Sequence, residues 1–347
     1  MTHYLAFSTF LIITTSFPTL LCATPDSMNT AFDLLYEEGI NLKVIELEFS
    51  MEEVEAHRRD EEEFPATFRF TAADGSRESW DIELNVRGRY RRMTCDFPPL
   101  KINFYKDDLE ERGLKKHNNL KLVTHCFGNW RGEDYLLREY VAYKLFHELF
   151  SISYRTQLVE VKYIDSVTGK TMTHYGIIIE DEKELADGYD SKLCEDCYSM
   201  PQDSFDQQYL VRLDLFQFMI GNADWSVRIL KNLKMLKPRD GGKYYLVPYD
   251  FDFSGFVDPH YVRLPASLGI QSVRERVYLG FEHDAAALQQ AFADFQSQKE
   301  ELYRIIEACD YLSKKSRNYL KRYLDSFFRY MNNIAPEYEQ LIADEQR

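Results

Sequence analysis

The first 25 residues contain no Asp, Glu, Lys or Arg. This absence leaves an apolar run, Leu5–Ala23, which ends in small residues and suits a cleavable signal peptide better than a membrane span. We therefore predict that residues 1–23 are a signal peptide and that the chain is either secreted or located in the periplasm or cell envelope. A lipid anchor at Cys22 is less favoured, because Leu20-Leu21 is a poor match to the small residues expected before such a cysteine.

Basic residues are also in short supply. The chain has 42 Lys and Arg against 57 Asp and Glu, for a formal charge of −15, which argues against binding nucleic acid or anionic lipid. The basic cluster Arg87–Arg92 is a local exception. No second apolar run is long enough to cross a bilayer, so we expect no transmembrane span in the mature chain. At 347 residues and 45% hydrophobic content, the chain can bury a sizeable core in one large domain or two lobes.

Cysteine is sparse, with six residues in all. Cys194 and Cys197 form a C-x-x-C pair, but no second pair with suitable spacing exists to complete a zinc site. In an oxidising compartment a local disulfide is the favoured reading of this pair. A redox-active pair is the alternative.

The N-terminal half is predicted to be mainly strands. Alternation of apolar and polar residues is clearest in 80–86, where Trp80 and every second residue point inward, and in 100–104, which sets Lys101 and Asn103 opposite the apolar face. Asp74-Gly75 is a hairpin turn signal. The expected strands are 44–49, 67–70, 80–86, 100–104, 158–164 and 174–180, with a short helix at 51–60.

The C-terminal half is predicted to be mainly helical. An earlier helix at 133–150 carries Glu139 in an otherwise apolar stripe, and a strand at 244–249 ends at Asp250. Between the two halves lies an acidic loop at 181–205. A strand-rich half followed by a helical half indicates an α+β fold. The expected later helices are 206–220, 285–308 and 312–334.

Polar residues stand at the ends of apolar segments in two places. Asn222-Ala223-Asp224 follows the apolar helix 206–220, and Asp250-Phe251-Asp252 follows a strand. Carboxylates are rarely buried without a partner, so these acids, with Asn232, are candidates for a metal ion and an acceptor hydroxyl. A network of helix caps and turns is the alternative.

The order of these features resembles the protein-kinase-like fold, and more closely the CotH-type spore-coat kinases and related secreted bacterial proteins. HipA-like kinases are distantly similar. The resemblance covers roughly residues 64–256 and implies a two-lobed fold, with a strand-rich lobe at 24–180 and a mainly helical lobe at 181–347. The matching segments are Val86-Arg87-Gly88-Arg89, Pro99-Leu100-Lys101-Ile102-Asn103-Phe104, Leu137-Arg138-Glu139-Tyr140, Asn222-Ala223-Asp224 and Asp250-Phe251-Asp252.

The resemblance implies an ATP-dependent and Mg²⁺-dependent phosphotransferase acting on an unidentified protein or small-molecule hydroxyl. Lys101 would contact phosphates while held by Glu139, and Asp224 would act on the acceptor. The implied nucleotide contacts are Arg87, Lys101, Glu180 and Asp181. The implied metal ligands are Asn232 and Asp250, with Asp252 either replacing Asp250 or acting as a second carboxylate ligand.

Several alternatives stay open. Lys101 is otherwise a solubilising residue on an edge strand, Glu139 a partner of Arg87 or Arg89, and the arginine cluster a solvated face. The sequence departs from protein kinases in having no glycine-rich phosphate loop and in the eight-residue spacing of Asp224 and Asn232. A non-catalytic binding module of the same fold, or a transfer of AMP from ATP, therefore remains a rival function.

Overall fold

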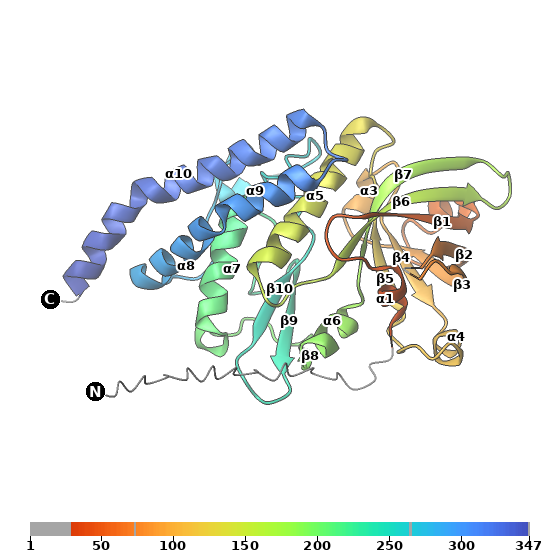
Figure 1. The fold of residues 1–347 in the computed structure, drawn as a ribbon, viewed down its shortest axis with the longest axis horizontal. Helices are drawn as coiled ribbons and strands as arrows, with labels where there is room; N and C mark the ends of the chain where they lie inside the picture. The colour runs from red at the N-terminus through yellow and green to blue at the C-terminus, as the bar shows by residue number, and fades with distance from the viewer. Residues whose placement is uncertain (1–28, 73, 264–265, 346–347) are drawn as a thin grey trace, which may run out of the picture.

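The computed structural model describes residues 29–72, 74–263 and 266–345, with side chains to residue 334. The expected signal peptide and Cys22 lie outside the described residues. The strands of residues 42–179 lie at one end of the molecule and the C-terminal helices at the other, with α5 between them (Figure 1). The fold is therefore mixed α and β, as predicted.

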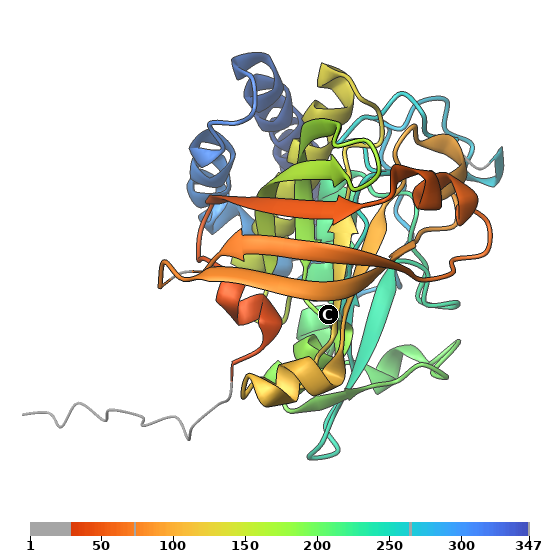
Figure 2. The same cartoon turned by 90° about the vertical axis from the view of Figure 1, so that its right-hand side faces the viewer.

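Seven strands close into a barrel in the order β1-β2-β3-β4-β5-β7-β6. Neighbours pair antiparallel, except that β1 pairs parallel with β6 over Leu42–Phe49 and thereby closes the sheet. Figure 2 views the molecule from this end. The strands are β1 (Leu42–Phe49), β2 (Phe64–Thr71), β3 (Arg77–Val86), β4 (Leu100–Phe104), β5 (Asn119–Val123), β6 (Thr156–Asp165) and β7 (Thr171–Ile179).

Alternation along the strands fills the barrel with apolar side chains. Trp80, Ile82 and Leu84 of β3 are buried in one core, together with Phe68 of β2 and Phe104 of β4. The alternate residues of β3–β5 form an outer face that is polar near Lys101 and apolar at Val123. Because paired residues in neighbouring strands point the same way, Lys101 lies beside Lys121, and Lys121 beside Ile179.

In the described part of the chain, four short helices accompany the barrel strands. The longer helix α5 packs in a second apolar core, outside the barrel. Helix α5 begins after Asn129, whose side chain caps it by accepting from the Arg131 and Gly132 amides at 2.9 and 3.3 Å. The expected stripe through Glu139 is confirmed as buried. The helices of this region are α1 (Ala31–Leu35), α2 (Met51–Ala56), α3 (Arg91–Thr94), α4 (Lys106–Glu111) and α5 (Trp130–Leu149).

The remaining residues build a small sheet and a group of helices. The acidic segment expected as a loop contains α6 and β8, and the helix expected at 285–308 is divided at Gln298 into α8 and α9. None of the helices in the described residues has the length and apolar character needed to cross a membrane. The elements are α6 (Glu182–Gly188), β8 (Ser191–Leu193), η1 (Gln202–Ser204), α7 (Gln207–Ile220), β9 (Leu233–Pro238), β10 (Tyr245–Pro248), η2 (Ala266–Leu268), α8 (Ala285–Ser297), α9 (Lys299–Ala308) and α10 (Lys314–Glu345).

Two disulfides are present in the described residues. Cys194 pairs with Cys197, as the sequence predicted, in the segment after β8. Cys95 pairs with Cys126, which joins the end of α3 to the connection between β5 and α5 and was not predicted. Cys309 is a buried free thiol.

Candidate functional site

A cavity of about 520 Å³ lies between the outer face of the barrel and the loops that precede β9 and follow β10. Val123 and Ile179 form an apolar part of its wall, and most of the other lining residues are polar. Two larger cavities, of about 820 and 880 Å³, lie elsewhere, and neither contains the predicted acids. The polar residues of the 520 Å³ cavity are Arg87, Arg89, Arg91, Glu139, Asp224, Lys231, Asn232, Asp250, Asp252 and Arg263. We call this cavity the acidic cleft.

The loop after α7 places Asp224 in the cleft. Helix α7 ends at Gly221, whose left-handed conformation, φ 62°, is one that glycine adopts without strain. The Asn222 side chain then accepts from the Asp224 amide at 2.9 Å and donates to Gln217 at 3.0 Å. Asn222 also bridges to Ser254, so the loop is fixed beside the chain that follows β10.

Asp224 and Asn232 are in direct contact. The Asn232 amide donates to the Asp224 carboxylate at 3.0 Å and to the Asp224 carbonyl at 2.7 Å. Lys231 forms an ion pair with the same carboxylate. Burial raises the pKa of Asp224, and the hydrogen bond from Lys231 opposes that rise. The eight-residue spacing therefore still brings the two predicted residues together.

Two predicted metal ligands have left-handed backbones. Asn232 has φ 53° and Asp250 φ 62°, a region that Asn and Asp enter more readily than other non-glycine residues. Neighbours hold these conformations: the Asp250 amide donates to the Tyr143 hydroxyl at 2.8 Å, and the Tyr249 amide to the Asn232 carbonyl at 3.1 Å. Unusual backbone held in this way is typical of functional sites.

Asp252 and Glu139 lie deeper, at 2% and 1% exposure. Burial raises the pKa of Glu139 to about 7, with Arg91 opposing and Asp250 adding to the rise. Burial, and next the neighbouring Asp250 charge, also raise the pKa of Asp252. The Tyr261 hydroxyl donates to Asp252 at 3.1 Å. In the described part of the chain, no Lys or Arg forms an ion pair with Asp250.

The predicted ion pair between Lys101 and Glu139 is wrong. Glu139 pairs instead with Arg91, at 3.4 Å, and Lys101 lines a separate hollow with Glu63 and Glu83. The cause is register: Lys101 points outward from β4, two strands away from β7, and a different segment delivers the cation to Glu139. Asp252, Asp250, Asn232 and Asp224, in contrast, share one cleft as predicted.

Glu180 and Asp181 connect β7 to α6, but their side chains are used elsewhere. Glu180 pairs with Arg155 at 2.7 Å in a buried network. Asp181 caps α6 by accepting from the Lys183 amide at 2.7 Å and also accepts from the Asn119 amide at 3.1 Å. Neither side chain lines the acidic cleft. Any nucleotide contact from this connection would come from its backbone.

Sequence reasoning missed three side chains of this region. Arg91 belongs to the basic cluster already noted, yet nothing in its spacing singles it out from Arg87 or Arg89. Lys231 directly precedes Asn232, and that adjacency was a usable signal. Lys121 contacts Glu182 at 3.0 Å and lies over the Tyr249 ring, and burial lowers its pKa to about 8.

The carboxylate and amide oxygens of the acidic cleft suit a hard cation that also binds water or phosphate oxygens. In the described residues, no three His, Cys, Asp or Glu side chains converge to hold a metal ion by themselves. Mg²⁺ commonly takes one or two carboxylates and completes its shell with water and phosphate oxygens. Asp250 and Asp252, two neighbouring carboxylates with the Asn232 amide in the same cleft, fit that requirement.

Comparison with known proteins adds little to this description. No family model matches the chain, and no curated protein does. The structure is similar to a crystal structure of a Helicobacter pylori proinflammatory kinase, CtkA, with a TM-score of 0.42 and 11% sequence identity, over 70% of this chain and 94% of that chain. At this level the similarity carries no argument, and the function must be inferred from the cleft itself.

Proposed function

We propose that this protein is a Mg²⁺-dependent phosphotransferase of kinase-like, two-lobed fold, which moves the γ-phosphoryl group of ATP to a protein or small-molecule hydroxyl. One observation carries the proposal: Asp224, Asn232, Asp250 and Asp252 line one cleft together with Arg87. Arg87 forms no ion pair in the described part of the chain, so it is available to a ligand anion. Oxygen ligands facing a cation in one cavity are what a metal–phosphate complex requires.

The residues would divide the work as follows. Asn232, Asp250 and Asp252 would hold Mg²⁺, which neutralises phosphate charge when bound. Arg87 would bind phosphate oxygens by charge-assisted hydrogen bonds. The apolar wall at Val123 and Ile179 suits an aromatic base. Lys101, predicted to contact the phosphates, lines a separate hollow and not the acidic cleft, so it has no role in this proposal.

Asp224 would act on the acceptor. Its carboxylate would accept the hydroxyl proton as the acceptor oxygen bonds to the γ-phosphorus and the bond from that phosphorus to the β-phosphate oxygen breaks. ADP would leave with the electron pair of the broken bond. Lys231, paired with Asp224, would keep this carboxylate oriented toward the cleft. Positioning and charge neutralisation account for most of the catalysis in reactions of this class.

We also propose that the chain works in an oxidising compartment. The Cys95–Cys126 and Cys194–Cys197 disulfides support this, because disulfides persist mainly outside the cytosol. The expected signal peptide at residues 1–23 would direct it there.

Radiolabel transfer tests the reaction. With Mg²⁺ and a mixture of extracellular proteins as acceptors, or the protein itself, label should move from γ-labelled ATP and not from α-labelled ATP. Label transferred from the α-position alone would replace phosphoryl transfer with AMP transfer. Failure of both labels, with Mg²⁺–ATP still bound, would leave a nucleotide-binding module. The Asp224→Asn variant is the background control for each label.

A further inference from the structure

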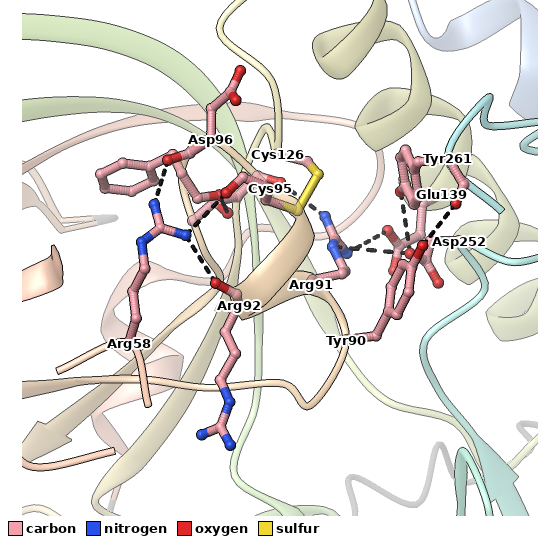
Figure 3. Close-up of a disulfide and its surroundings, with 12 residues drawn as sticks. Arg58, Tyr90, Arg91, Arg92, Cys95, Asp96, Cys126, Glu139, Asp252 and Tyr261 are labelled. Carbon is pink, nitrogen blue, oxygen red and sulfur yellow. Dashed lines mark hydrogen bonds and ion pairs between the residues drawn. A yellow bond between two sulfur atoms is a disulfide. The ribbon is translucent and has the colours of Figure 1, made fainter. Parts of the chain in front are cut away.

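Arg91 is a buried cation at the centre of the cleft acids. It is 8% exposed. One guanidinium nitrogen, Nη1, lies 3.4 Å from Glu139 Oε2, and Nε lies 3.9 Å from Asp252 Oδ2. Nη2 donates to the Thr124 carbonyl at 3.0 Å. Figure 3 shows the guanidinium between the disulfide Cys95–Cys126 and the two acids. One side chain therefore links α3, α5, the end of β5 and the segment after β10.

The positions of the two acids depend on this cation. Glu139 Oε1 has no hydrogen-bond partner in the described structure, so Arg91 is what fixes the orientation of that carboxylate. A buried carboxylate without a cation is strongly unfavourable. Removal of Arg91 would therefore leave Glu139 and Asp252 to neutralise or to move.

Arg91 lies on a helix that is too short to be stable in isolation. Helix α3 spans only Arg91–Thr94 and has no side-chain cap at its start. A single turn is not stable on its own, because helix nucleation is costly. The position of Arg91 therefore depends on contacts on both sides of α3. At the start, the Tyr90 hydroxyl donates to the Tyr261 carbonyl at 2.9 Å. Two further contacts lie at the end of α3.

The Cys95–Cys126 disulfide makes the first of these contacts. Cys95 directly follows α3, and its amide donates to the Arg91 carbonyl at 2.8 Å. Cys126 lies two residues after Thr124, whose carbonyl accepts from Arg91. The Phe97 amide also donates to the Cys126 carbonyl at 3.1 Å. The disulfide thus joins the backbone that carries Arg91 to the backbone that receives its hydrogen bond.

Arg58 makes the second contact. Its Nη1 donates to the carbonyls of Arg92 and Cys95 at 2.8 and 2.9 Å, and its Nη2 to the Asp96 carbonyl at 2.5 Å (Figure 3). The Arg92 and Cys95 carbonyls are among those that the end of a helix leaves without partners. Arg58 and the disulfide hold the same short segment from two sides.

We propose that Arg91 is a positioning residue that orders Glu139 and Asp252 for the cleft, and that the Cys95–Cys126 disulfide holds Arg91 in place. The inference rests on the proposed function, because Asp252 is one of the proposed Mg²⁺ ligands and Glu139 lines the same cleft. Both cysteines are buried, at 4% and 2% exposure, so the disulfide is shielded from reductants.

A double-mutant cycle in chemical unfolding tests the inference without any ligand. The Cys95→Ala/Cys126→Ala change is made in the native sequence and in an Arg91→Met background. If the disulfide acts through Arg91, its removal should change the folding equilibrium constant about tenfold less in the Arg91→Met background. Equal effects in the two backgrounds would overturn the inference, because a disulfide that only restricts the unfolded chain acts independently of Arg91.

Nucleotide affinity gives a second, separate readout. Loss of Cys95–Cys126 should weaken Mg²⁺–ATP binding at least about tenfold, whereas Cys194→Ala/Cys197→Ala, the matched disulfide variant, should leave it within about twofold. Arg91→Lys should restore part of the binding lost in Arg91→Met. Equal losses in the two disulfide variants would contradict the inference. If the native protein binds no Mg²⁺–ATP, the proposed function fails and the unfolding cycle alone decides this inference.

The alanine pair is replaced by another variant if it does not fold. Arg58→Gln loosens the same segment but leaves both cysteines and the cleft-lining residues unchanged. Its matched control is Arg112→Gln. Arg112 pairs with Glu78 and donates to the Ser79 carbonyl, both at 3.0 Å, much as Arg58 pairs with Glu55 at 2.6 Å and donates to carbonyls. A non-additive effect with Arg91→Met for Arg58→Gln, and an additive one for Arg112→Gln, supports the inference. Additivity for both contradicts it.

Discussion

Asp224→Asn is expected to preserve Mg²⁺–ATP binding and to slow phosphoryl transfer by about 10²–10⁴-fold, the usual contribution of a general base. Asparagine has nearly the same size as aspartate, so the loop should keep its shape. The amide cannot accept the acceptor proton, however, and it carries no charge to orient the hydroxyl. Single-turnover transfer and equilibrium binding of Mg²⁺–ATP measure the two halves of this expectation.

Asp294→Asn is the matched control. The Asp294 carboxylate also receives both a cation and an amide, from Arg212 and Gln290 at 3.0 and 2.9 Å, but lies on α8 and does not line the acidic cleft. It should transfer phosphate at the native rate. Equal loss of binding and transfer in Asp224→Asn would instead assign Asp224 to the nucleotide or the metal and refute the division of roles.

Asp250→Asn is expected to abolish Mg²⁺-dependent nucleotide binding. The Asp250 carboxylate shares the cleft with Asp252 and forms no ion pair with Lys or Arg in the described residues, so it is free to bind a cation. Replacing it removes one of two proposed anionic ligands, and a hard divalent cation prefers carboxylate to amide oxygen. We expect at least about a hundredfold loss of affinity, which corresponds to roughly 2.7 kcal/mol. Calorimetric titration of ATP with and without Mg²⁺ measures it.

The control for this variant must be an aspartate with the same left-handed backbone conformation. Asp258 also has a left-handed backbone, φ 55° against 62° for Asp250, but it pairs with Arg274 and does not line the acidic cleft. Asparagine tolerates this conformation as well as aspartate does. Asp258→Asn should therefore bind Mg²⁺–ATP normally. Native affinity in Asp250→Asn would place the metal elsewhere.

Local patterns were sufficient to predict most of the elements. Alternation in 80–86 and the apolar stripe through Glu139 correspond to β3 and α5, because both elements bury one face against a core. The pairing of β1 with β6 could not be foreseen, since two strands distant in sequence carry no local mark of being neighbours. The closed barrel followed from that pairing.

The candidate site was predictable where polar residues follow apolar segments. Asp224 and Asp250 met that description and share a cleft. The cation for Glu139 was not predictable in the same way. Arg91 reaches Glu139 from a single helical turn that has no periodic signal, and a disulfide between Cys95 and Cys126, 31 residues apart, helps to place it. Such an arrangement depends on tertiary contacts that sequence spacing does not encode.

Binding of Mg²⁺–ATP to the native protein is the most direct test of the central claim, that the acidic cleft is a metal–nucleotide site. Unfolding should be followed with Mg²⁺ alone, ATP alone and both together. We expect stabilisation only with both, by roughly 2.7 kcal/mol when the ligand is at about 100 times its Kd. This stabilisation should be lost in Asp250→Asn and kept in Asp258→Asn. No stabilisation of the native protein at saturating Mg²⁺–ATP, or an equal effect in Asp250→Asn, would contradict the claim.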